Sequence, residues 1–223
     1  MKKISINKLA EYLDSEALRR RRIIQEQKEP LPFIVTRYKE AKNAMINFII
    51  SNYNENIIDN TIEMLNEKKC TSDFEISDRN TSIEALESFL EIKFPDTLLD
   101  FKISKPKKKY SLKIKDLNVN INPDLLIRGK YRGKNIVGGI KIHISKTHPL
   151  NSENRKNVAT MIHKVIEDKE LNDVKKEISN LNFCISIDVF NSEYDVAPKS
   201  YKKRRKNIEF ACDEIGFVWD KID

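Results

Sequence analysis

Apolar residues recur at spacings of three and four along the first third of the chain, which is the period of an amphipathic α-helix. Two prolines, Pro30 and Pro32, interrupt this pattern. We therefore expect three or four helices between Asn7 and about Lys68. The apolar positions that define these helices are Leu9, Leu13, Leu18, Ile23, Ile24, Val35, Tyr38, Ala41, Met45, Phe48, Ile49, Ile57, Ile58, Ile62 and Leu65.

A polar stretch without periodicity follows, and we expect a loop or a domain boundary over Lys69–Asn80. The next helix is predicted to start at Thr81 or Ser82 and to end at Pro95. Thr81 and Glu84 have the spacing of a capping box, and an apolar stripe comes directly after them.

Four segments are then predicted to be extended: Leu98–Ser104, Tyr110–Lys115, Leu117–Arg128 and Asn135–Ser145. In the last segment isoleucines alternate with Lys141, His143 and Ser145, so this strand has one apolar and one polar face. Two glycines and several basic residues between Gly129 and Asn135 indicate a hairpin turn that joins it to the preceding segment.

The remainder of the chain alternates between helix and strand. Asn151 or Ser152 is predicted to cap a helix that runs to about Asp168. The run Phe183–Phe190 is nearly all apolar, which is typical of a strand buried on both faces. A final amphipathic helix carries Ile208, Cys212, Ile215 and Trp219. We therefore expect a mixed α/β protein, with a helical extension over residues 1–70 and an α/β domain over residues 81–223.

Two short motifs lie in the α/β part. Asn122-Pro123-Asp124 falls in the third extended segment, and Gly139-Ile140-Lys141 falls in the alternating strand. Together with the order helix, three strands, helix, strand, these motifs resemble the core of the PD-(D/E)XK nucleases. The resemblance implies an α-β-β-β-α-β core, to which this chain adds helices at the N-terminus and an amphipathic helix at the C-terminus.

In that family the Pro-Asp pair enters the second strand and its Asp binds a divalent ion. The resemblance therefore implies that Asp124 is a ligand of Mg²⁺ or Mn²⁺ and that Lys141 assists the attacking water. Such an ion neutralises charge on a phosphodiester and lowers the pKa of bound water, and carboxylate oxygens suit it as ligands. Asp124 and Lys141 can meet because facing side chains on adjacent antiparallel strands lie within about 5.5 Å of each other.

Gly139 stands where the family has an Asp or Glu, and a glycine has no side chain to hold a metal ion. Three alternatives remain open. The acid has moved to Glu153, twelve residues after Lys141 in the first turn of the next helix. Alternatively, Glu84 or Glu87 on the preceding helix adds a ligand, or the site is inactive.

Charge adds a second line of argument. The formal net charge is +7, and the excess is concentrated in Arg19–Arg22, Lys105–Lys109 and Lys199–Lys206. Polyanions are the natural partners of such clusters, and an ordinary solvated surface is the alternative. The third cluster begins the last helix, where the macrodipole disfavours cations, so phosphate binding explains it better than helix energetics do. The residues that we expect to contact nucleic acid are Tyr201, Lys202, Lys203, Arg204, Arg205 and His143.

Other classes of protein are disfavoured. Three widely spaced cysteines without a CxxC pair argue against a disulfide framework and against a zinc ribbon. No stretch approaches the roughly 18 to 20 consecutive apolar residues of a membrane span, and polar residues follow the Met-Lys-Lys start. We expect a cytoplasmic protein without membrane contact.

These features predict a metal-dependent nuclease, and the resemblance implies DNA rather than RNA as its substrate. By the same analogy the protein belongs to a restriction, phage-defence or mobile-element setting. One alternative is a catalytically inactive subunit of nuclease fold that binds nucleic acid or docks a partner protein through the helices of residues 1–70. A helical interaction protein unrelated to nucleases is the third possibility.

Overall fold

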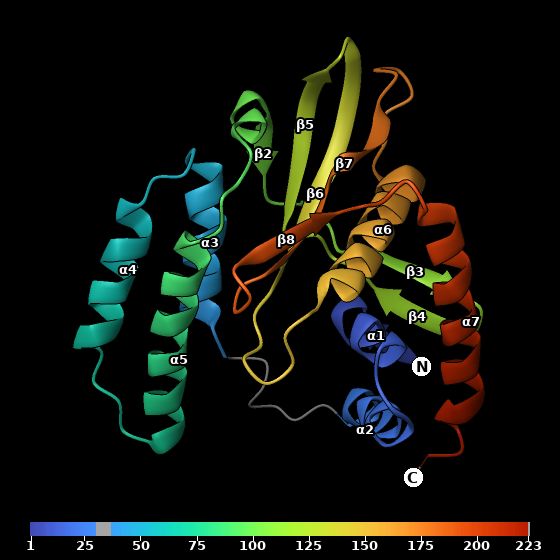
Figure 1. Ribbon diagram of the computed structural model, residues 1–223, viewed down its shortest axis with the longest axis horizontal. Coiled ribbons are helices and arrows are strands. Elements are labelled where there is room, and N and C mark those ends of the chain that lie inside the picture. Colours follow the sequence, from blue (N-terminus) through green and yellow to red (C-terminus); the bar gives the residue numbers. More distant parts are fainter. Residues whose placement is uncertain (30–36, 223) are drawn as a thin grey trace.

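The computed structural model describes residues 1–29 and 37–222, and it contains two β-sheets with helices on both sides (Figure 1). Its helices are α1 (Ile6–Leu13), α2 (Ala17–Lys28), α3 (Lys39–Ile50), α4 (Asn56–Glu67), α5 (Asp73–Leu90), α6 (Ser152–Lys169) and α7 (Tyr201–Trp219), with a 3₁₀ turn, η2, at Asp96–Asp100. Its strands are β1 (Lys3–Ser5), β2 (Lys102–Ser104), β3 (Ser111–Ile114), β4 (Leu117–Asn120), β5 (Leu125–Tyr131), β6 (Lys134–His143), β7 (Ile178–Asp188) and β8 (Glu193–Val196). Pro30, Pro32 and Val35 lie outside the described residues.

The larger sheet has the strand order β2-β5-β6-β7-β8. β5 is antiparallel to both of its neighbours, β6 and β7 are parallel, and β8 is antiparallel to β7. The parallel pair is joined through α6, as such a crossover requires. Apart from β3 and β4, which follow β2 and belong to the small sheet, the chain passes in order through α5, β2, β5, β6, α6 and β7. The predicted mixed α/β class is confirmed.

The smaller sheet has the order β1-β4-β3, in which β1 is parallel to β4. The prediction of one strand over Leu117–Arg128 is wrong, because this segment leaves the small sheet after β4 and enters the large sheet as β5. Asn122 lies at the break with a φ of 31°, and its side-chain oxygen accepts a hydrogen bond of 2.6 Å from the Tyr110 amide. Pro123 then removes a backbone donor, so regular pairing stops there.

Helix α5 begins earlier than the sequence pattern indicates. Ser72 is its N-cap and accepts from the Glu75 amide, so the expected loop over Lys69–Asn80 is wrong from Asp73 onward. Thr81 is not a cap, because it lies within the helix and its hydroxyl donates to the Ser77 carbonyl at 2.8 Å. The capping-box spacing therefore occurs here inside a helix.

Two hydrophobic clusters lie on opposite faces of the large sheet. Side chains of α3, α4 and α5 cover one face, and side chains of β1, α1, α2, α6, α7 and the small sheet pack on the other (Figure 1). The alternation along β6 separates them, since Ile140 and Ile142 belong to the first cluster and Val137 to the second. Within residues 1–70 the described part of the chain forms four helices, in agreement with the predicted three or four, and they contribute to both clusters. Their role in docking a partner stays a prediction.

The connections on either side of β6 fix the end of the sheet that carries the motifs. Arg132 and Gly133 both have positive φ, which is the backbone of a two-residue hairpin turn between β5 and β6. Asn151 caps α6 by accepting from the Asn154 amide, as the sequence predicts. The three cysteines are free, and no helix among the described residues is both long and apolar enough to cross a membrane.

Candidate functional site

Asp124 and Lys141 lie together at the end of the β5–β6 pair that is remote from the hairpin turn. The Asp124 amide donates to the Ile140 carbonyl at 2.7 Å, which places Asp124 directly before β5 and next to Lys141. The Lys141 ammonium donates to the Asn122 carbonyl at 2.8 Å and lies 3.5 Å from the Asp124 carboxylate. The proximity expected from the two motifs is therefore present.

A third residue at this point, Lys42 on α3, was missed by the sequence analysis. Its ammonium lies 2.8 Å from Oδ1 of Asp124, while Oδ2 of Asp124 accepts a hydrogen bond of 2.8 Å from the Ile142 amide. A cation in the first turn of a helix is disfavoured by the macrodipole, and this is the one signal in the sequence that could have pointed to Lys42. We call Lys42, Asp124 and Lys141 the Asp124 centre.

The members of the Asp124 centre differ in their exposure to solvent. The side chains of Asp124 and Lys141 are 12% and 14% exposed, and that of Lys42 is 34% exposed. Burial lowers the pKa of the Lys141 ammonium, Asp124 opposes this shift, and the charge of Lys42 adds to it. Two ammonium groups and one carboxylate give the centre a net positive charge when all three are ionised.

Gly139 lies on the same face of β6 as Lys141 but beneath α6. A Cβ atom at this position would lie 3.1 Å from Cγ2 of Ile162 and 3.3 Å from Cδ1 of Ile166. Both isoleucines are fully buried. The place of the missing acid is thus occupied by the apolar packing of α6 on the sheet.

The other acids assigned to metal binding have different surroundings. The Glu153 side chain is 63% exposed, and its carboxylate lies 2.6 Å from Arg204 and 3.3 Å from Lys156. The hydrogen bond from Arg204 lowers the pKa of Glu153. Glu87 is exposed on α5, which packs on the opposite face of the sheet from α6. Within residues 1–29 and 37–222 no group of three or more His, Cys, Asp or Glu side chains is arranged to hold a metal ion.

The Asp124 centre does not fit the ion that the resemblance implies. Mg²⁺ requires near-octahedral oxygen ligands and is usually held by one or two carboxylates. Asp124 offers one carboxylate here, and its two oxygens already contact Lys42 and the Ile142 amide. Lys141 adds a second positive charge at 3.5 Å.

His143, one of the residues expected to contact nucleic acid, is half-buried beside a second polar cluster. Its Nε2 atom lies 2.9 Å from the carbonyl of His148, which accepts, so Nε2 carries the proton. Burial lowers the pKa of His143 and raises that of its neighbour Asp188. Oδ2 of Asp188 accepts from the Leu150 amide at 2.6 Å, so this pair holds the connection between β6 and α6. The contact of His143 with nucleic acid stays a prediction.

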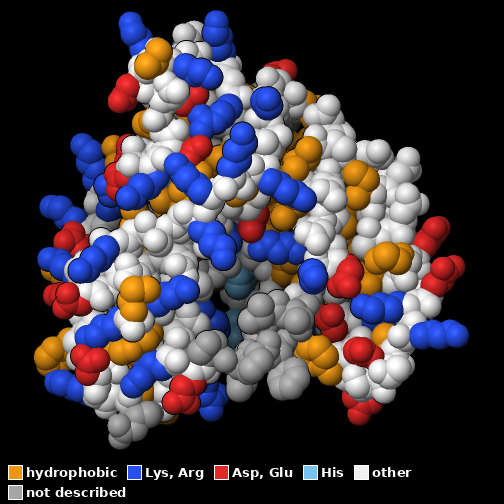
Figure 2. All heavy atoms as spheres, turned by 180° about the vertical axis from the view of Figure 1, so that it is seen from behind, with side chains coloured by type: hydrophobic (Ala, Val, Ile, Leu, Met, Phe, Trp, Pro, Cys, Tyr) orange, Lys and Arg blue, Asp and Glu red, His pale blue; other side chains and the backbone are white. Residues whose placement is uncertain are grey.

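The face seen in Figure 2 is hollowed near its centre. Histidine side chains lie at the floor of this hollow, and many Lys and Arg side chains gather above and beside it (Figure 2). Such a surface favours an anionic partner.

The basic segment at the start of α7 divides into two kinds of residue. Arg204 bonds to Glu153 and to Asn157, and Arg205 lies 2.7 Å from Glu167, so both arginines join α7 to α6. The guanidinium of Arg205 also covers the ring of Tyr201 at 4.8 Å. Lys202 and Lys203 are exposed. These two lysines are therefore better placed to meet a phosphate backbone than the arginines are.

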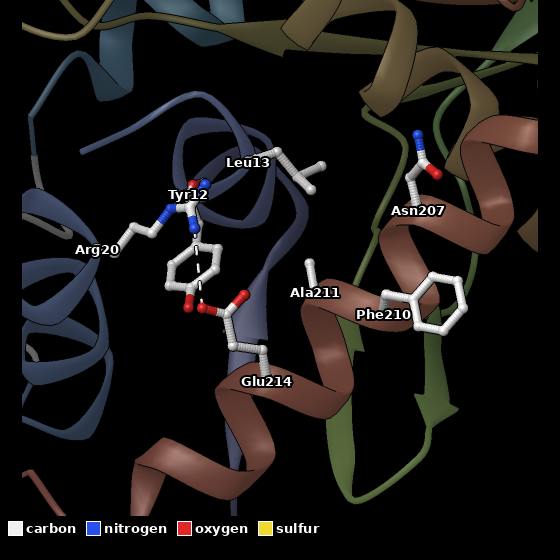
Figure 3. A pocket seen from close by; sticks show the side chains of 7 residues that line it. All are labelled: Tyr12, Leu13, Arg20, Asn207, Phe210, Ala211 and Glu214. Carbon is white, nitrogen blue, oxygen red and sulfur yellow. Dashed lines mark hydrogen bonds and ion pairs between the residues drawn. The ribbon is translucent and has the colours of Figure 1, made fainter. Parts of the chain in front are cut away.

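A separate pocket of about 290 Å³ lies between α1, α2 and α7 (Figure 3). Arg20 and Glu214 face each other across it at 3.7 Å, and Tyr12 points toward Glu214. Burial, together with Glu214, raises the pKa of Tyr12 to about 12. The run Arg19–Arg22 is thus partly committed to acidic neighbours, since Arg19 also pairs with Glu11 at 2.5 Å.

The cluster Lys105–Lys109 borders an ionic network centred on Glu170. The Glu170 carboxylate accepts hydrogen bonds of 2.5 Å from both Tyr110 and Arg128, and the Lys108 ammonium lies 3.3 Å from it. Burial alone would raise the pKa of Glu170, but the hydrogen bonds from Tyr110, Arg128 and Lys108 outweigh it and lower the pKa.

Glu170 is expected to make stability depend on pH in the acid range. A carboxyl group whose pKa is lowered by folding stabilises the protein above its ordinary pKa of 4.5, and this contribution is lost as the pH falls through the lowered value. Buried Asp188, whose pKa is raised, contributes with the opposite sign. Urea unfolding at about pH 7 and about pH 4 should show a smaller loss of stability for Glu170→Gln than for the wild type. Equal losses in the two proteins would exclude this role of Glu170.

A scan of protein-family models and a search of curated proteins find no match to this chain.

Proposed function

We propose that the chain is a DNA-binding protein built on a PD-(D/E)XK-like core, and that the phosphate backbone lies over the Asp124 centre without metal-dependent cleavage. The observation that carries this proposal is the pair of ammonium groups, Lys42 and Lys141, that flank the Asp124 carboxylate at 2.8 and 3.5 Å. Protonated amines at such spacing form charge-assisted hydrogen bonds with phosphate oxygens.

The fold supports the proposal in two ways. The elements α5, β2, β5, β6, α6 and β7 follow in the order that the resemblance implies, and Pro123-Asp124 directly precedes β5. The exposed lysines Lys202 and Lys203 add further positive charge at the start of α7. A setting in restriction, phage defence or mobile elements follows from fold-level analogy.

A metal-dependent nuclease is the second candidate. It is favoured by one specific observation, namely that Asp124 and Lys141 meet at 3.5 Å at the point where the family places its metal ligand and its lysine. The surroundings of Gly139, Glu153 and Lys42 favour the first candidate instead.

Neutralising Lys141 tests the proposal. In Lys141→Met the affinity for duplex DNA is expected to fall about tenfold, and the slope of log affinity against log salt is expected to shrink by about one, because one phosphate contact is removed. Lys130→Gln is the matched control. This variant removes the same charge from an exposed position at the hairpin end of β5. Fluorescence anisotropy over a salt series measures both quantities.

The same preparations separate the two candidates. Supercoiled plasmid incubated with Mg²⁺ or Mn²⁺ is expected to stay intact. Cleavage by the wild type that Asp124→Asn abolishes would establish the nuclease in its place. Equal DNA affinity of Lys141→Met and Lys130→Gln, or no binding by the wild type, would contradict the proposal.

A further inference from the structure

Lys42 takes the place at Asp124 that the resemblance gives to a metal ion. Its ammonium lies 2.8 Å from Oδ1, and Oδ2 is held by the Ile142 amide at the same distance. Lys141 approaches from β6 at 3.5 Å. A divalent ion bound by this carboxylate would have to displace one ammonium and lie beside the other, and like charges at that range repel.

The packing of α3 against the large sheet and α5 fixes the position of Lys42. Its neighbours Ala41 and Met45 are fully buried in the cluster between α3 and the large sheet. The start of α3 is also held to α5, because the Tyr38 amide donates to Asp78 at 3.0 Å. A rigid helix therefore carries the Lys42 ammonium to Asp124.

We propose that Lys42 is the resident cation of the Asp124 centre, and that it holds a DNA phosphate together with Lys141 in place of a metal-bridged phosphate. Asp124 then acts as a positioning residue that keeps the two ammonium groups apart and oriented. The proposal rests on the DNA binding proposed above, and it adds that this binding needs no metal.

The first experiment uses DNA. Wild-type affinity for duplex DNA is expected to be the same for protein as purified and for protein treated with EDTA. Lys42→Gln is expected to bind about tenfold more weakly with a smaller salt slope. The control Lys39→Gln removes the same charge from an exposed position one turn earlier on α3 and is expected to change affinity much less.

Added Mg²⁺ gives a sharper test. In Lys42→Gln, Oδ1 of Asp124 loses its ammonium partner, so Mg²⁺ is expected to bind there and to restore part of the lost affinity. It should restore none in Lys42→Gln/Asp124→Asn and none in Lys39→Gln, in which Mg²⁺ competes for the DNA as any salt does. Failure of Mg²⁺ to distinguish Lys42→Gln from the double variant would overturn the proposal.

The second experiment needs no DNA, so it separates this proposal from failure of DNA binding. Electron paramagnetic resonance with Mn²⁺ alone is expected to show no stoichiometric site in the wild type. A wild-type Mn²⁺ site that Asp124→Asn removes would overturn the role of Lys42, whether or not DNA binds. Circular dichroism melts of each variant verify that a loss of affinity reflects the site and not unfolding.

Discussion

Replacing Gly139 with aspartate is expected to lower the free energy of unfolding by about 3–5 kcal/mol and to create no metal-dependent cleavage. The substitution restores the acid of the family motif in sequence, but the new Cβ would meet Ile162 at 3.1 Å and Ile166 at 3.3 Å. A carboxylate placed between these apolar side chains and the sheet loses its hydration without gaining a partner. Urea unfolding followed by circular dichroism measures the loss.

Gly139→Ala is the control for size alone. It adds the same Cβ without the charge, so its cost is expected to be smaller, about 1–3 kcal/mol. The difference between the two variants reports the buried charge. A Gly139→Asp protein as stable as the wild type, with a Mn²⁺ site that depends on Asp124, would show that position 139 faces the Asp124 centre.

Arg155→Met is expected to destabilise the protein by about 2–3 kcal/mol, because it removes the buried member of an ionic cluster whose partner Glu193 is 60% exposed and leaves the half-buried Asp195 carboxylate without its guanidinium. The Arg155 side chain is 4% exposed and donates to Asp195 at 2.8 Å, to Glu193 at 2.5 Å and to the Leu150 carbonyl at 2.7 Å. It thereby ties α6 to β8 and to the connection before α6. Chemical denaturation with unchanged slope would verify the loss.

Lys156→Met provides the matched control on the next residue of α6. The Lys156–Glu153 pair is exposed, with its atoms 3.3 Å apart, so its removal should cost less than about 0.5 kcal/mol. Similar losses in the two variants would mean that the Arg155 cluster contributes no more than an ordinary surface ion pair.

Sequence reasoning succeeded where the signal is local. The alternation along Asn135–Ser145 located β6, and the polar residue Asn151 located the start of α6, because each depends on neighbours a few positions away. The meeting of Asp124 and Lys141 was also predictable, since a hairpin brings its two ends together.

The failures have a physical origin as well. Lys42 comes from a helix far earlier in the chain, and no period or spacing links it to Asp124. The expected contact of Arg204 and Arg205 with nucleic acid stays a prediction, but no pattern in the sequence indicates that Glu153 and Glu167 on another helix are their ion-pair partners. The spacing of Thr81 and Glu84 matched a cap, but the true cap is Ser72, which is followed by the acids Asp73 and Glu75 in the first turn of the helix. A local sequence pattern cannot show whether a residue has a partner that is distant in the sequence but close in the fold.

During synthesis of the chain, β1 cannot form its parallel pair until β4 has left the ribosome. Lys3–Ser5 leave the ribosome well before their partners Asn118–Asn120, so Ile4 stays uncovered until that later segment has emerged. Contacts between residues so distant in sequence form slowly, and apolar segments that wait for them are prone to aggregate. Recombinant yield of this protein is therefore expected to respond to slower translation or to added chaperones more than its final stability would suggest.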